Sequence, residues 1–141
     1  MIAISTALIL LIIAALHGAW ALGITWPDRT GEALARRVAG FKGITRMPPP
    51  LSCLAVASAM VVAALLVLDI VPLPDSLRLL ALVGLTAIFA FRGVLAYNTR
   101  WREMTPEEPF ATLDRRYYGP LCLVIALGFA MTIVGKFGGT S

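Results

Sequence analysis

One histidine, one arginine and one aspartate stand in or beside long apolar segments, where polar side chains are costly and often functional. His17 follows sixteen residues without a charged side chain, Arg92 lies inside another apolar run, and Asp114 stands just before a third. Histidine exchanges protons near neutral pH, whereas arginine and aspartate supply fixed charges of opposite sign. Such a set can bind a polar head group in a membrane or carry out acid–base chemistry there.

Four apolar runs must position these side chains, at about 2–22, 51–71, 77–97 and 118–135. Each is close to the roughly 20 residues with which a helix crosses about 30 Å of hydrocarbon. Hydrophobic residues make up 59% of the 141 residues and charged residues only 14%, which is too apolar for a water-soluble domain of this size. We therefore predict an all-α fold: a single transmembrane domain, residues 1–141, built as a four-helix bundle.

The loops predict the orientation of this bundle. The segments 23–50 and 98–117 carry nine Lys and Arg residues, whereas 71–76 carries none. Basic loops stay in the cytoplasm, so both termini are expected outside, N-out and C-out. The net charge of +4 would then face anionic lipid head groups, and we expect no nucleic-acid partner. No basic residue precedes the first run, so we predict a retained helix and not a cleaved signal peptide.

Depth along the predicted helices brings the polar residues to one end of the bundle. His17 and Arg92 each lie about five residues beyond the middle of their helix, or roughly 7–8 Å at 1.5 Å per residue. Asp114 and Tyr118 stand at the cytoplasmic entrance to the fourth helix, and Trp20 lies three residues beyond His17. We predict that these five residues form one cluster in the cytoplasmic leaflet.

Each member of the cluster also has a purely structural interpretation. Arg92 can extend its charged end to the head groups or form a structural pair with Asp114. His17 can hold one hydrogen bond between helices. Trp20 and Tyr118 can anchor the protein at the membrane interface.

Cys53 and Cys122 fall just inside predicted helix starts on the cytoplasmic side, where structural disulfides are rare. We expect free thiols that pack as small apolar residues. A metal site that combined them with His17 and Asp114 would draw on four separate segments without any ligand spacing. We therefore predict no metal site, and the sequence identifies no cofactor.

Two loop segments carry helix signals. EALARRVAG, 32–40, contains good helix formers and is predicted to lie along the membrane surface. The segment 105–108, TPEE, has the signature of a helix start. From Phe110 onward, Phe110, Asp114 and Tyr118 would share one face of a helix, and Gly119-Pro120 would bend or begin the fourth span.

Two motifs resemble a known family. The first is His17-x-x-Trp20-x-x-Gly23 followed by Trp26-Pro27, and the second is Phe110-x-x-x-Asp114-x-x-x-Tyr118-x-Pro120-Leu121-Cys122-Leu123. In this order and in a chain of this size, they resemble a family of small bacterial membrane proteins catalogued as a domain of unknown function. In that family a serine often stands at the position of Gly119. The resemblance implies a multi-helix bacterial membrane protein and assigns no reaction. We predict a multi-pass protein of the bacterial inner (cytoplasmic) membrane.

Three functions remain open, and whether the protein is an enzyme is undecided. The preferred one is binding of a lipophilic ligand, for example a quinone or isoprenoid head group, or of a membrane partner, through the predicted cluster. The second is a small intramembrane enzyme in which His17 is the acid or base, Asp114 orients it and Arg92 stabilises negative charge. The third is a structural subunit of a larger membrane complex.

Overall fold

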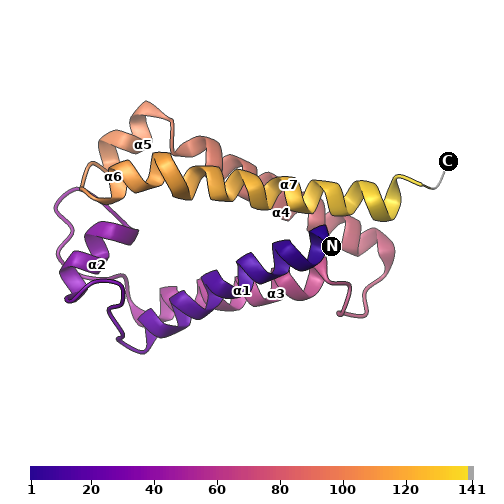
Figure 1. Ribbon diagram of the computed structural model, residues 1–141, viewed down its shortest axis with the longest axis horizontal. Coiled ribbons are helices and arrows are strands. Elements are labelled where there is room, and N and C mark those ends of the chain that lie inside the picture. Colours follow the sequence, from indigo (N-terminus) through magenta and orange to yellow (C-terminus); the bar gives the residue numbers. More distant parts are fainter. Residues whose placement is uncertain (140–141) are drawn as a thin grey trace.

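The computed structural model describes residues 1–139, and within this range it is built of helices and loops without strands (Figure 1). Four helices are long and apolar enough to cross a membrane. They are α1 (Ile2–Ala21), α3 (Pro50–Val67), α4 (Asp75–Leu95) and the continuous helix Phe110–Phe137, which comprises α6 (Phe110–Leu113), η1 (Asp114–Tyr118) and α7 (Gly119–Phe137). The short helices α2 (Gly31–Val38) and α5 (Thr99–Met104) lie in the connections. The predicted all-α membrane bundle of four helices is confirmed.

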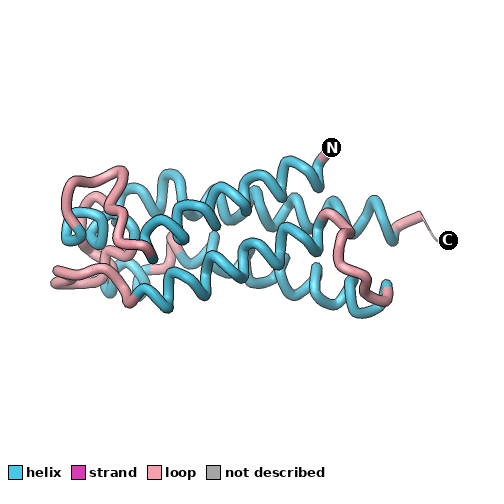
Figure 2. The backbone as a smooth tube through the Cα atoms, turned by 90° about the horizontal axis from the view of Figure 1, so that it is seen from below, coloured by secondary structure: helices cyan, strands magenta, loops and turns pink. Residues whose placement is uncertain are grey.

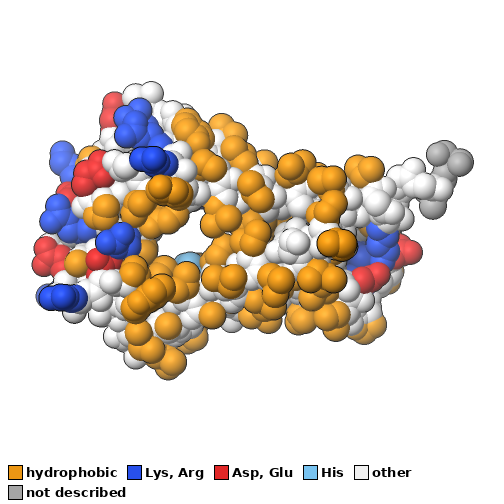
Figure 3. All heavy atoms as spheres, in the orientation of Figure 1, with side chains coloured by type: hydrophobic (Ala, Val, Ile, Leu, Met, Phe, Trp, Pro, Cys, Tyr) orange, Lys and Arg blue, Asp and Glu red, His pale blue; other side chains and the backbone are white. Residues whose placement is uncertain are grey.

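The long helices form two antiparallel pairs that approach each other at one end and diverge at the other (Figure 1). α1 packs along α3, and α4 packs along α7, whereas contacts between the pairs are fewer. We call the end with α2, α5 and their loops the basic end, because Lys and Arg gather there (Figure 3). The opposite end, with the N-terminus and the 68–74 turn, is the closed end (Figure 2).

The shared core of the two pairs lies toward the closed end. Leu10 of α1, Leu82 of α4 and Phe129 of α7 are almost fully buried there. Gly128 lets α1 approach α7, because a Cβ atom at this position would lie 2.2 Å from Oγ1 of Thr6. Small residues permit such close approach of helices in lipid.

A buried arginine also fastens the closed end. Arg78 is only 3% exposed, and its guanidinium donates to the carbonyl of Leu66 at 3.1 Å and pairs with Asp69 at 2.7 Å. Lys136 of α7 pairs with the same aspartate. These contacts join the end of α3, the beginning of α4 and the end of α7.

The fourth span begins at Phe110, eight residues before the predicted start at 118. Pro120 lacks an N–H group and would ordinarily disturb a helix that extends so far before it. Here the preceding turn is widened to a π-helix, in which the Gly119 N–H donates to the carbonyl of Asp114. The helix therefore continues through Gly119-Pro120 and carries Asp114 inside the span.

Other boundaries also differ from the sequence prediction. α3 ends at Val67, four residues before the predicted end at 71. The predicted helix start at Thr105 is wrong, because this residue follows the last turn of α5 and its hydroxyl donates to the carbonyl of Trp101 at 2.9 Å. The predicted loop helix near 32–40 is present as α2, but Leu34 and Ala35 are buried within the protein and not turned toward lipid.

Candidate functional site

A cavity of about 550 Å³ lies between the two helix pairs near the basic end. Figure 3 shows the molecule hollowed there, with the histidine at the edge of the opening. All four spans, α2 and the first loop line this cavity: Ile13, Leu16, His17, Trp20, Trp26, Pro27, Arg37, Val38, Ala39, Met47, Pro48, Ser52, Cys53, Val56, Met60, Phe89, Arg92, Tyr118, Leu121 and Cys122. Its volume falls within the roughly 300–1,000 Å³ of small-molecule sites.

Four of the five residues predicted to cluster lie in the wall of this cavity. They are His17 and Trp20 of α1, Arg92 of α4 and Tyr118 at the end of η1. Asp114 does not line the cavity; it is 2% exposed and contacts Arg92. The similar depth of the polar residues therefore corresponds to a shared cavity wall, with the carboxylate placed behind it.

Arg92 and Asp114 form an ion pair supported by a tryptophan. Nη2 of Arg92 donates to Oδ1 of Asp114 at 2.6 Å, and Nε1 of Trp101 donates to Oδ2 at 2.9 Å. The Trp101 ring also lies under the guanidinium, with its centroid 5.4 Å from Cζ of Arg92. Pairing lowers the free-energy cost of placing two charges in a membrane. Nη1 of Arg92 is buried and has no hydrogen-bond partner within residues 1–139.

His17 is held by its own helix. Nδ1 of His17 lies 2.9 Å from the carbonyl oxygen of Ile13, four residues earlier, so the expected bond to another helix is wrong. Because a carbonyl oxygen only accepts, Nδ1 carries the hydrogen, and Nε2 of the neutral ring is then a hydrogen-bond acceptor. The ring also packs against Trp20, with centroids 4.8 Å apart.

Trp20 also positions the loop that closes part of the cavity. Its Nε1 donates to the carbonyl of Trp26 at 2.9 Å, which holds the turn after α1 against the end of the helix. Trp26 and Pro27 of this turn lie in the cavity wall. Trp20 is therefore a structural part of the wall as well as an aromatic surface facing the cavity.

Tyr118 connects the fourth span to α2. Its hydroxyl donates to the carbonyl of Arg37 at 3.2 Å, and its ring packs against Phe110 with centroids 5.9 Å apart. Arg37 in turn forms two hydrogen bonds with Asp28, at 2.6 and 3.1 Å. The hydrogen bond that Arg37 donates to Asp28 is the largest influence that raises the pKa of Arg37, so this side chain stays charged and paired.

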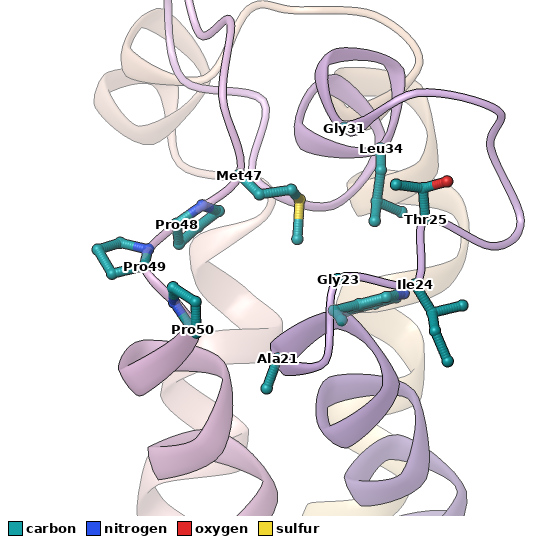
Figure 4. A pocket seen from close by; sticks show the side chains of 11 residues that line it. Ala21, Gly23, Ile24, Thr25, Gly31, Leu34, Met47, Pro48, Pro49 and Pro50 are labelled. Atoms are coloured by element: carbon teal, nitrogen blue, oxygen red, sulfur yellow. The ribbon is translucent and has the colours of Figure 1, made fainter.

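A smaller cavity of about 290 Å³ adjoins the main one between the end of α1, α2 and the proline run before α3. Figure 4 shows the side chains of Met47 and Leu34 extending into this space from opposite sides. Trp20, Met47 and Pro48 line both cavities. The space between the helix pairs thus continues toward the loops of the basic end.

Two residues of this site were not among the predicted candidates. Arg37 belongs to a run of basic loop residues whose number indicates topology, and nothing in the sequence distinguishes it from Arg36. Trp101 resembles an ordinary interface tryptophan, and its spacing from Asp114 matches no helical repeat. The folded position of α2 brings Arg37 to the cavity, and that of α5 brings Trp101 to the ion pair.

The arrangement is suited to binding an amphipathic molecule. Its walls are mostly aliphatic and aromatic, with a donor at Arg92 and an acceptor at His17. Cys53 and Cys122 are free thiols in opposite helix pairs. Among residues 1–139, no group of three His, Cys, Asp or Glu side chains is arranged to hold a metal ion.

The enzyme hypothesis pairs His17 with Asp114. In it, Asp114 orients His17, and such a pair needs hydrogen-bond distance, about 2.6–3.2 Å, or one water between them. Both oxygens of Asp114 are instead bonded, to Arg92 and to Trp101. Nδ1 of His17 is bonded to Ile13. Within residues 1–139, the hydrogen bonds of Asp114 and of Nδ1 of His17 therefore go to other partners, and the orienting role of Asp114 toward His17 stays a prediction.

Comparison with known proteins agrees with the resemblance to a family of unknown function. Searches among curated proteins and among solved structures gave no match. Residues 10–129 match a family described as "Protein of unknown function (DUF3995)", and this range covers both motifs and most of the chain. The protein therefore belongs to the DUF3995 family of proteins of unknown function.

Proposed function

We propose that this multi-pass membrane protein binds a lipophilic molecule in the cavity between its two helix pairs. The proposal places the protein in a bacterial inner membrane with the basic end in the cytoplasm, as the distribution of Lys and Arg favours. The cavity then opens within the cytoplasmic leaflet. His17, Trp20, Arg92 and Tyr118 contact the head of the ligand, and Asp114 positions Arg92.

The observation that carries the proposal is the composition of the cavity wall. Apolar side chains from all four spans surround a space of about 550 Å³, and few polar groups interrupt them. Apolar walls accept apolar molecules more readily than water, and a few placed polar groups orient such a ligand. No comparable observation favours an enzyme or a structural subunit.

Native mass spectrometry of the gently solubilised protein tests this proposal. We expect a small lipophilic molecule to remain bound to the wild type and to be lost from Val56→Trp, which fills the cavity from α3. Leu54→Trp is the matched control, because Leu54 lies on the same helix, is 48% exposed and does not line the cavity. It should retain the molecule.

Two results would overturn the proposal. One is a wild-type protein that retains no small molecule after extraction in several mild detergents and co-purifies with another membrane protein, as a structural subunit would. The other is equal retention by wild type and by a well-folded Val56→Trp variant, which would place the bound molecule outside the cavity.

A further inference from the structure

Resting on the proposed function, we infer that the ligand has an uncharged head group that carries a hydroxyl. Two independent features of the cavity wall lead to this chemistry. One is the balance of charge on the wall, and the other is the number of hydrogen-bond acceptors that the wall presents.

The charges on the wall are already compensated. Among residues 1–139, two charged side chains line the cavity, Arg37 and Arg92. Arg37 is paired with Asp28 through two hydrogen bonds, and Arg92 is paired with Asp114 at 2.6 Å. An anionic head group would lose its hydration without meeting a free positive charge, and it would be repelled by the aspartates. A neutral head group avoids both costs.

The cavity wall presents hydrogen-bond acceptors, so a ligand that carries a donor can form hydrogen bonds with it. In its neutral form, His17 uses Nδ1–H for the Ile13 carbonyl, so Nε2 of the ring accepts. Tyr118 uses its hydrogen for the Arg37 carbonyl, so its oxygen also accepts. Arg92 retains donor capacity, because its side chain is 31% exposed and its hydrogen bond from Nη2 to Asp114 uses only one of the five guanidinium hydrogens.

A hydroxyl matches this set better than a carbonyl or a hydrocarbon head does. Its hydrogen can be donated to His17 or Tyr118, and its oxygen can accept from Arg92. A ketone or a quinone only accepts and leaves both acceptors of the wall unmatched. A hydrocarbon matches none of them. An unmatched buried polar group costs more free energy than one hydrogen bond contributes, so the hydroxyl head is preferred.

Competition binding with tail-matched probes tests this inference. Tritiated hexadecanol is bound to the purified protein in detergent and displaced by hexadecanol, hexadecanesulfonate or hexadecane. We expect hexadecanol to bind at least about tenfold more tightly than either competitor. His17→Phe keeps a ring but removes the acceptor, so hexadecanol should bind it about fivefold more weakly while hexadecane is unaffected. Leu16→Phe, a neighbour in the same wall, should not change the order of the three probes.

The outcomes separate this inference from the proposed function. Equal or tighter binding of the sulfonate would overturn the neutral head, and equal binding of hexadecane would overturn the hydroxyl; in both cases the cavity still binds a lipophilic molecule. Unchanged hexadecanol affinity in His17→Phe would also overturn the inference. Binding of no probe, together with no retained molecule in the mass spectrum, would overturn the proposed function itself.

Discussion

The two ends of the bundle are held together by different means. At the closed end, side chains of all four spans share a core that includes Leu10, Leu82 and Phe129, and Arg78 ties the helix ends together. At the basic end the helix pairs diverge around the cavity, and bonds between the loops connect them (Figure 1). The closed end is therefore a packed core, whereas the basic end surrounds the cavity.

The loop contacts at the basic end form what we call the clasp: Arg36, Lys42, Gly43, Met104 and Glu107. The Lys42 N–H donates to the Met104 carbonyl at 3.1 Å, and the Gly43 N–H donates to Oε1 of Glu107 at 3.0 Å. Arg36 pairs with the same glutamate at 3.0 Å. Exposed polar contacts of this kind contribute little free energy, so we expect the clasp to add less to the stability of the protein than the closed core does.

The largest expected effect is in the closed core. Phe129→Ala removes a side chain that is fully buried between the helix pairs and should lower the free energy of unfolding by about 3–5 kcal/mol. Met131→Ala, at a residue of the same helix that is 47% exposed, should change it far less. Unfolding in mixed micelles with increasing dodecyl sulfate measures both. A similar small loss in both variants would contradict a shared core at this end.

A smaller effect is expected at the ion pair behind the cavity. Asp114→Asn removes the negative partner of Arg92 and should lower the free energy of unfolding by about 2 kcal/mol, the scale of a hydrogen bond to a charged group. A double-mutant cycle with Arg92→Met isolates the contribution of the pair. In the double variant most of the penalty should disappear, because no uncompensated charge remains. Additive losses would show that the two side chains act independently.

The smallest effect is expected in the clasp, and it depends on pH. The Gly43 N–H and, secondarily, Arg36 hold the pKa of Glu107 below its ordinary value of 4.5. A lowered pKa in the folded protein means that this carboxylate stabilises the clasp above about pH 4.5, and that the stabilisation is lost as pH falls through the lower folded value. Glu107→Gln should therefore remove part of the acid sensitivity.

Hydrogen exchange at the Gly43 amide, followed between pH 7 and pH 3, measures this effect. After correction for the intrinsic pH dependence of exchange, the amide should lose protection on acidification in the wild type. In Glu107→Gln its protection should be lower at pH 7 and nearly constant. The pKa of Asp69 is also lowered, mainly by its hydrogen bond with Lys136. Asp69 lies at the closed end and is unchanged in Glu107→Gln, so it does not contribute to the difference between the wild type and this variant. A pH profile that Glu107→Gln leaves unchanged would assign the acid sensitivity to another group.

The sequence predicts the number of spans well because apolar length alone determines it. It also places His17 and Arg92 at one depth, since depth follows from position along a helix of constant rise. The start of the fourth span is not predictable in this way. Gly119-Pro120 reads as a helix boundary, and only the π-helical turn at Asp114–Tyr118 reconciles the proline with a continuous helix.

Contacts across the loops are harder to infer. Trp101 of α5 donates to Asp114 across 13 residues of sequence, and buried Arg78 donates to the Leu66 carbonyl near the end of α3 and to the Val71 carbonyl beyond it. Neither residue stands out by type or spacing. The separation of the helix pairs, which creates the cavity, depends on packing among all four spans and has no local signal in the chain.

The most direct test compares thiol accessibility at two positions that lie one helical turn apart on the same face of α7. In a Cys53→Ala background, Cys122 lines the cavity, whereas Ala126, one turn further along α7, is 5% exposed in the closed core. The second protein carries Ala126→Cys together with Cys122→Ala. A lipophilic maleimide should label Cys122 in the first protein at least about tenfold faster than it labels the introduced cysteine in the second. Hexadecanol should slow the labelling of Cys122 and leave the rate at position 126 unchanged. Equal labelling rates at both positions, without protection by hexadecanol, would contradict a ligand cavity at the basic end.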